Sequence, residues 1–247
     1  MSLPLASIPS NSVQMRAVVV LQLEVVESFC LTPQKLFKQR TLQTLRLLEL
    51  RRNVSDSLYV SRAGLKLEYA LDRFEFDVNG LSCADLGCNI GGFSDCLLQR
   101  GAQKLYAVDT GYGTFAWKLR SDERVITMER TNALHVEPPQ FVELVVVDLG
   151  WTKQDVALPA AMRWLDGGTI ISLVKPHYEL SEDEKQIEQV GEGLSIEAIE
   201  HVMERVRRTC LDLGLEILAE TTSPIKGKKS SKKGNGNSEI LLLLRCS

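Results

Sequence analysis

Short apolar runs alternate with segments of helical spacing over most of the chain. The apolar runs span residues 81–87, 104–109, 125–129, 141–150, 167–176, 215–222 and 239–245. Apolar positions recur with the spacing of a helix in residues 93–102, 114–122, 153–165 and 195–213. Strands that alternate with helices form a parallel sheet whose two faces are both covered. The pattern therefore predicts an α/β fold.

The first 57 residues are patterned differently. The β-branched stretch 17–26 favours a strand, and residues 33–52 favour a basic helix with an imperfect apolar face. A shift in composition at residues 53–57 marks the expected boundary. We expect an N-terminal extension over residues 1–57, basic in its second half, and a second domain over residues 58–247.

No apolar stretch near the start approaches the roughly 18–20 residues that a transmembrane helix needs. The apolar run 17–21 is interrupted by Gln22 and Glu24, and the first basic residue, Arg16, comes too late for a secretory signal. We therefore expect a cytoplasmic protein that does not act on membranes.

Composition excludes several classes of protein. The chain has 247 residues, of which 44% are hydrophobic and 25% charged, unlike collagen-like, mostly disordered or disulfide-scaffold proteins. Its six cysteines include no C-x-x-C pair, so we expect reduced thiols and no zinc or other metal site.

The net charge of −3 conceals an uneven distribution. Residues 33–66 carry eight basic and two acidic side chains, whereas residues 179–200 carry eight acidic and one basic. A second basic cluster, of five lysines, occupies residues 226–233. Separate basic patches on an acidic protein suit contact with a polyanion, and solvated surface charge is the alternative.

A glycine-rich segment, DLGCNIGGFSD at residues 85–95, lies between a predicted strand and a predicted helix. Glycines there permit a tight turn and close approach of the backbone to a ligand. The next predicted strand ends in Asp109, where a carboxylate is placed to accept hydrogen bonds from a ribose diol. Because Asn89 occupies the second glycine position of the dinucleotide fingerprint, the segment fits S-adenosylmethionine better. The alternative is a structural turn and a surface aspartate.

Two later predicted strands end in charged residues, Asp148 and Lys175. Ligands of open α/β sheets bind beyond the carboxyl ends of the strands, so both side chains should face the crevice of the glycine turn. A lysine becomes a general base when desolvation lowers its pKa, and a nearby carboxylate opposes that lowering. A solvated strand-end cation and a turn residue are the structural alternatives.

Two flanking segments supply further polar candidates. Ser61, in SRAGLKL, stands where a helix opens and is expected to cap it. Glu239 opens the last predicted strand, directly after the lysine-rich loop. By residue type alone, each is more often a surface residue than a catalytic one.

Seven ordered segments together resemble a known family. They are YVSRAGLKLEYAL, DLGCNIGGFSD, AVDTGYGTFAWKLR, ERTNA, VVVDLGW, LVKPHYEL and NSEILLLLR. The set is similar to FtsJ-like RNA ribose 2′-O-methyltransferases, and most similar to the TlyA (haemolysin A) type, over residues 58–247. That type carries an N-terminal S4 RNA-binding domain, which is not recognisable in residues 1–57. The resemblance implies a class I, Rossmann-like sheet of seven strands with an antiparallel last strand.

The resemblance also implies roles for particular residues. The family's Lys-Asp-Lys-Glu tetrad falls by motif on Lys66, Asp148, Lys175 and Glu239, with Lys175 activating the ribose 2′-hydroxyl and the other three positioning it. The implied cofactor is S-adenosyl-L-methionine. Its implied contacts are Asp85, Gly87, Cys88, Asn89, Gly91, Gly92, Phe93, Asp109, Asn132 and Asp148.

The expected activity is methyl transfer to the ribose of RNA, most simply ribosomal RNA. Phosphate contacts are expected from Arg62, Lys226, Lys228 and Lys229. The alternatives are a methyltransferase that acts on a small molecule, and an RNA-binding protein with a vestigial cofactor site. The sequence leaves the oligomeric state open.

Overall fold

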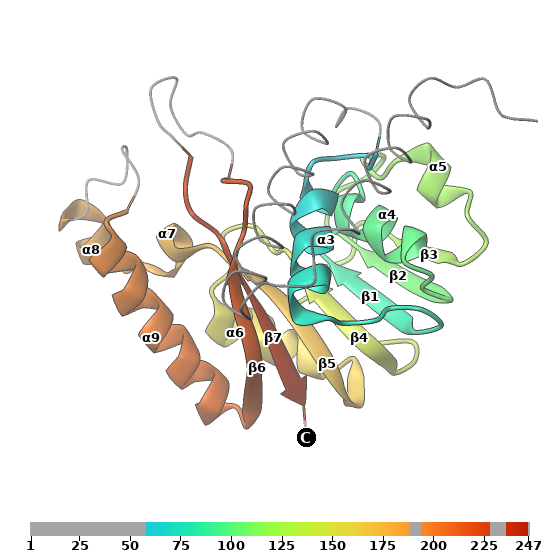
Figure 1. Cartoon of the computed structure of the whole chain (residues 1–247). Helices are drawn as coiled ribbons and strands as arrows, with labels where there is room; N and C mark the ends of the chain where they lie inside the picture. The colour runs from blue at the N-terminus through green and yellow to red at the C-terminus, as the bar shows by residue number, and fades with distance from the viewer. Residues whose placement is uncertain (1–57, 188–193, 228–235, 247) are drawn as a thin grey trace, which may run out of the picture. The chain divides into compact units, whose positions relative to one another are not determined.

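The computed structural model describes residues 58–187, 194–227 and 236–246. At its centre lies a seven-stranded sheet flanked by helices (Figure 1). Every apolar run that predicts a strand in these residues forms one, so the α/β prediction is confirmed. The strand predicted at 17–26 and the basic helix predicted at 33–52 lie outside the described residues.

The sheet has the strand order β3-β2-β1-β4-β5-β7-β6. The strands are β1 (Ser82–Leu86), β2 (Lys104–Val108), β3 (Val125–Met128), β4 (Val142–Val147), β5 (Leu165–Val174), β6 (Leu215–Thr222) and β7 (Ile240–Cys246). β7 pairs antiparallel with both β5 and β6, and the other neighbours pair in parallel. The strand order reverses between β1 and β4, and sheets of this kind form a ligand crevice beyond the carboxyl ends at the reversal.

Helices cover both faces of the sheet. They are α3 (Ala63–Phe74), α4 (Gly92–Gln99), α5 (Trp117–Arg120), α6 (Gln154–Met162), α7 (Pro176–Glu179), α8 (Glu182–Ile187) and α9 (Ile196–Asp212). α3 and α4 share one apolar cluster with the sheet, and α6 and α9 share the other. No helix in the described ranges combines the length and the apolar character needed to cross a membrane.

The central strand β4 shows why the buried strands can be predicted from the sequence. Leu144 and Val146 belong to the cluster beneath α3 and α4, whereas Val145 and Val147 belong to the cluster beneath α6 and α9. A strand buried on both faces needs an uninterrupted apolar run rather than an alternating one. The run LVVV at residues 144–147 meets that need, and the one charged residue of the strand, Glu143, is exposed near its start.

Local patterns mislead at two places. The helix predicted at 114–122 is reduced to α5, because Ala116 is extended and its N–H donates to the carbonyl of Ile90 at 3.0 Å. The N-cap of α3 is Arg62 rather than Ser61, whose hydroxyl accepts a hydrogen bond from the N–H of Ala63 at 3.4 Å. In both cases a contact with the glycine turn decides where the helix begins. Ala116 is bonded to Ile90 of that turn, and Ser61 lies against Gly92.

Replacing Leu144 by alanine should lower the free energy of unfolding by about 2–5 kcal/mol, because it opens a cavity in the centre of the sheet. The matched control is Leu211→Ala on α9, where the leucine is 64% exposed and the expected change is within about 0.5 kcal/mol. Urea unfolding followed by circular dichroism measures both. Equal effects of the two substitutions would contradict this assignment of the core.

Candidate active site

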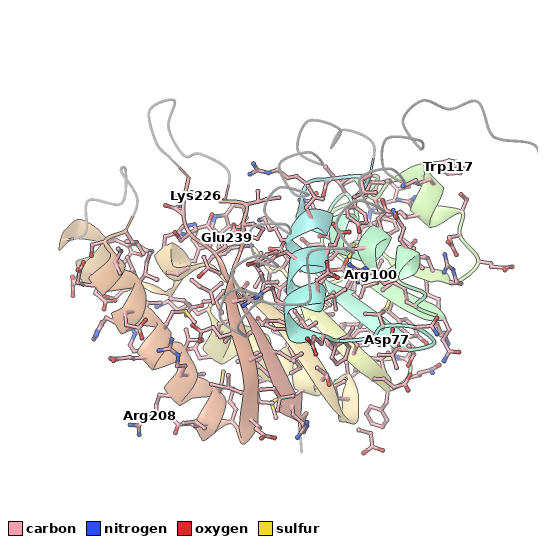
Figure 2. All side chains as sticks on the ribbon, viewed as in Figure 1. Asp77, Arg100, Trp117, Arg208, Lys226 and Glu239 are labelled. Atoms are coloured by element: carbon pink, nitrogen blue, oxygen red, sulfur yellow. The ribbon has the colours of Figure 1, made fainter. Side chains whose placement is uncertain are left out.

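A cavity of about 390 Å³ opens beyond the carboxyl ends of β1, β4 and β5. Its walls come from the start of α3, the glycine turn after β1 and the residues that follow β4 and β5. Figure 2 shows Glu239 and Lys226 at this end of the sheet, and Asp77 and Arg208 at the opposite end. The cavity therefore occupies the crevice that the strand order predicts.

The glycine turn lines this cavity with backbone. Gly87 has φ +92°, and a Cβ there would lie 2.6 Å from the carbonyl oxygen of Asp148. A Cβ on Gly92 would lie 2.2 Å from the hydroxyl of Ser61. The segments that contain Asp148 and Ser61 thus pass too close to the turn for any residue larger than glycine. Main-chain atoms therefore form this part of the cavity wall.

Asp85, the last residue but one of β1, lines the cavity and is 1% exposed. Its Oδ2 accepts a hydrogen bond from the hydroxyl of Ser94 at 2.6 Å, while its Oδ1 has no partner among the described residues. Burial raises the pKa of Asp85 to about 7 against the opposing effect of the Ser94 hydrogen bond, and the charge of Asp148 adds to the rise. A buried carboxylate oxygen without a donor is suited to receive a cationic ligand.

Two lysine–carboxylate pairs lie in the walls of the cavity. Lys66 of α3 pairs with Glu239, which precedes β7, and both side chains are buried. Lys175, which follows β5, places its Nζ 2.5 Å from Oδ1 of Asp148, which follows β4. The Nζ of Lys175 also donates to the carbonyl of Leu149 at 3.4 Å. The four tetrad residues expected from the family resemblance therefore line one cavity.

Most of the residues expected to contact the cofactor line the same cavity. These are Asp85, Gly87, Cys88, Asn89, Gly92, Phe93 and Asp148. Asp109 does not line it, because its carboxylate accepts hydrogen bonds from the N–H groups of Asn89, at 2.9 Å, and Gly111, at 2.7 Å. Asn132 is exposed, and its side chain accepts from the N–H of Leu134. Gly91 packs against Phe115 and Leu119 instead.

The residues expected to contact RNA are placed only in part. Arg62 is exposed and contributes to the wall of the cavity. Lys226 is exposed beside Gly227, another lining residue, whose N–H donates to the carbonyl of Asn237 at 2.9 Å. Lys228 and Lys229 lie outside the described residues.

Sequence reasoning missed three aromatic side chains of the cavity: Trp151, His177 and Tyr178. Trp151 is 81% exposed, has φ +59° and lies with its ring edge toward Tyr178, at 6.5 Å between centroids. Burial, and then the charge of Lys175, lower the pKa of His177 to about 4, so this imidazole is neutral at physiological pH. Each stands two or three residues after Asp148 or Lys175, and this proximity to strand ends was the available signal.

Comparison with known proteins shows the family of the chain. The model of the FtsJ-like methyltransferase family matches residues 59–233. A Bacillus subtilis protein provisionally named as the rRNA methyltransferase YqxC is 38% identical over 191 residues, which are 75% of this chain. The aligned part spans 65% of that relative, a little under two thirds of its length.

Two further relatives come from other bacteria. The 16S/23S rRNA (cytidine-2′-O)-methyltransferase TlyA of Mycobacterium tuberculosis is 36% identical over 198 residues, covering 77% of this chain and 70% of TlyA. The crystal structure of a Lactococcus lactis protein provisionally named as a hemolysin is 34% identical, with a TM-score of 0.68 over 76% of this chain and 89% of that one. On the family match and these identities, the chain belongs to the FtsJ-like methyltransferase family.

Proposed function

We propose that this protein transfers a methyl group from S-adenosylmethionine to the 2′-hydroxyl of a ribose in ribosomal RNA. The observation that carries the proposal is the meeting of Lys66 with Glu239, and of Lys175 with Asp148, in the cavity beside the glycine turn. Two relatives named as rRNA methyltransferases support the choice of RNA.

The residues present fit S-adenosylmethionine. Its ammonium group would meet Oδ1 of Asp85, the buried oxygen that lacks a donor. Its body would lie on the main chain of Gly87 and Gly92, flanked by Cys88, Asn89 and Phe93. A volume of about 390 Å³ is within the usual range for small-molecule sites. When bound, the cofactor supplies an electrophilic methyl group on a sulfonium.

The tetrad would prepare the accepting oxygen. The charged Lys175 would first release a proton to solvent, and its neutral Nζ would then accept the proton of the ribose 2′-hydroxyl while Asp148 holds that amine in place. Lys66, buried against Glu239, would orient the ribose from α3. His177, neutral at physiological pH, adds no positive charge beside Lys175. Because the acceptor is a 2′-hydroxyl, the reaction itself distinguishes RNA from DNA.

The rim of the cavity suits a polynucleotide. Arg62 and Lys226 are exposed there and would contact phosphates, together with Lys228 and Lys229 of the lysine-rich segment. The exposed ring of Trp151 offers a surface for a base. We further propose that residues 58–247 form the catalytic domain and that residues 1–57 are an N-terminal extension, basic in its second half. We propose that the protein acts in the cytoplasm, where it meets rRNA.

The direct test incubates the full chain with labelled cofactor and ribosomal RNA, then maps the modified nucleotides. We expect label on ribose oxygens of a defined site. Label confined to base atoms, or no label on RNA from any ribosomal fraction, would refute the proposed function.

Replacing Lys175 by methionine should reduce the single-turnover rate of methyl transfer by at least about a hundredfold, because the proton acceptor is lost. Binding of S-adenosylhomocysteine, measured by calorimetry, should change little. The matched control is Lys104→Met at the opposite end of the sheet, where the Nζ donates to the side chain of Gln140 and lies 5.1 Å from the centre of the Tyr106 ring. Wild-type turnover in Lys175→Met would remove that residue from the reaction.

Cofactor affinity should rise with pH through the titration of Asp85. Its pKa is raised to about 7, so the carboxyl is largely neutral at about pH 5.5, and deprotonation creates the charge that attracts an ammonium. The affinity for S-adenosylhomocysteine, which keeps the ammonium, should increase up to about tenfold per pH unit below that pKa.

The side chains around Asp85 supply the controls for this pH dependence. Asp85→Asn should bind weakly and show a flat pH profile in calorimetric titrations. Ser94→Ala should shift the profile to higher pH, because the Ser94 hydrogen bond holds the pKa of Asp85 down. An unchanged profile in Asp85→Asn would exclude this carboxylate as the group that titrates.

A further inference from the structure

Two large aromatic rings stand exposed between β2 and the end of α5. Tyr112 is 69% exposed and Trp117 is 77% exposed. Together they border a shallow hollow of about 510 Å³, which is separate from the catalytic cavity and shares none of its lining residues. Phe115, 4% exposed, lies in the apolar core beneath, so burial accounts for that ring and not for its two neighbours.

Hydrogen bonds hold the segment that carries these rings. The side chain of Glu129 accepts from the N–H of Gly113 at 2.8 Å and from Arg120 at 2.6 Å. The N–H of Arg130 donates to the carbonyl of Gly111, and its guanidinium lies 4.1 Å from the centre of the Tyr112 ring. The rings are therefore presented to solvent by a tethered backbone, which lowers the entropic cost of binding a ligand.

The hollow lies beside the catalytic cavity. The N–H of Ala116, a lining residue of the hollow, donates to the carbonyl of Ile90, a lining residue of the cavity. Figure 2 shows Trp117 at the same end of the molecule as Lys226 and Glu239, away from Asp77 and Arg208. A polymeric ligand bound at the mouth of the cavity can therefore extend over the hollow.

Two cationic side chains flank the exposed rings. Arg130 is exposed, and the described residues provide it with no carboxylate partner. Lys118 follows Trp117 and is 55% exposed at its side chain, although it pairs with Asp95 at 2.9 Å. Exposed rings beside guanidinium and ammonium groups match a single-stranded polynucleotide, whose bases stack and whose phosphates are anionic. An apolar protein surface would take Arg130 out of water without offering it an opposite charge.

We propose that Tyr112 and Trp117 form a stacking surface for unpaired bases of the RNA strand that flanks the target ribose. The proposal rests on the proposed function, because it takes RNA as the substrate. It adds a second contact, on the β2 side of the cavity, to the phosphate contacts expected from Arg62 and Lys226. The rings provide binding energy through base faces, so their contribution requires that the bases be unpaired.

The test compares Trp117→Ala, Tyr112→Ala and the conservative Trp117→Phe with the wild-type full chain. The probe is a fluorescein-labelled single-stranded RNA oligonucleotide, and fluorescence anisotropy measures its Kd. Each alanine variant should raise the Kd at least about fivefold, the lower limit for the loss of one stacked base, and Trp117→Phe should restore most of the affinity. The same RNA annealed to its complement should bind all variants alike, because its bases are covered.

The matched control is Phe141→Ala, which removes an exposed aromatic ring, 59% accessible, just before β4 at the opposite end of the sheet. It should leave both Kd values unchanged. The dependence of log Kd on log salt should keep its slope in Trp117→Ala, because no phosphate contact is lost, and should become shallower in Lys118→Ala.

Three outcomes would overturn the proposal. They are an unchanged Kd for single-stranded RNA in both alanine variants, an equal loss of affinity for duplex RNA, and a lower melting temperature of Trp117→Ala without any change in Kd. The last would mean that the ring packs against another part of this chain. If wild-type protein methylates ribosomal RNA while any of these is found, the stacking surface fails and the proposed function stands.

Discussion

Four charged side chains must be taken out of water at one end of the sheet, and each must find its opposite charge there. Lys66 and Glu239 are buried, and Lys175 and Asp148 are 14% and 22% exposed at their side chains. Removing an ion from water is so unfavourable that an unpaired member of either pair would be strongly destabilising. Helix α3, the ends of β4 and β5, and the start of β7 are thereby required to meet at one place.

The sheet supplies the stability that this meeting requires. Its central strands are apolar on both faces, with α3 and α4 packed on one side and α6 and α9 on the other. Hydrophobic stabilisation scales with the apolar area removed from water. The large apolar core of the sheet therefore offsets the free-energy cost of burying charged side chains at its edge. The antiparallel strand β7 has a particular part in this arrangement, because it brings Glu239 back to the carboxyl ends of its neighbours. A parallel last strand would start at the opposite end.

Desolvation governs the electrostatics around the cavity before any ligand is bound. Burial raises the pKa of Asp85 to about 7 and lowers that of His177 to about 4. Burial also raises the pKa of Glu179 to about 7, although the N–H of Gln154 donates to its carboxylate. Glu179 ends α7, the short helix that carries His177 and Tyr178 to the cavity. Both carboxyl groups shift toward the neutral form, and the imidazole is kept neutral, as expected where water has been excluded.

The strands, the helices that cover them and the glycine turn could be predicted from the sequence, because burial on both faces of a strand and a tight turn each leave a local pattern. Asp148 and Lys175 could be located for the same reason, since each ends an apolar run. Lys66 and Glu239 could be assigned only by resemblance to a family. They lie within a helix and just before a strand, where no local pattern marks a buried charge.

Tertiary structure decided which side chains meet. It paired Lys66 with Glu239, directed the carboxylate of Asp109 to two backbone N–H groups, and left Asn132 outside the lining of the cavity. It also shortened α5 through the hydrogen bond between Ala116 and Ile90, and left Tyr112 and Trp117 facing solvent. Periodicity along a chain records only whether a position is buried. Contacts between distant segments depend on the order and direction in which the strands pair, and no single segment carries that information.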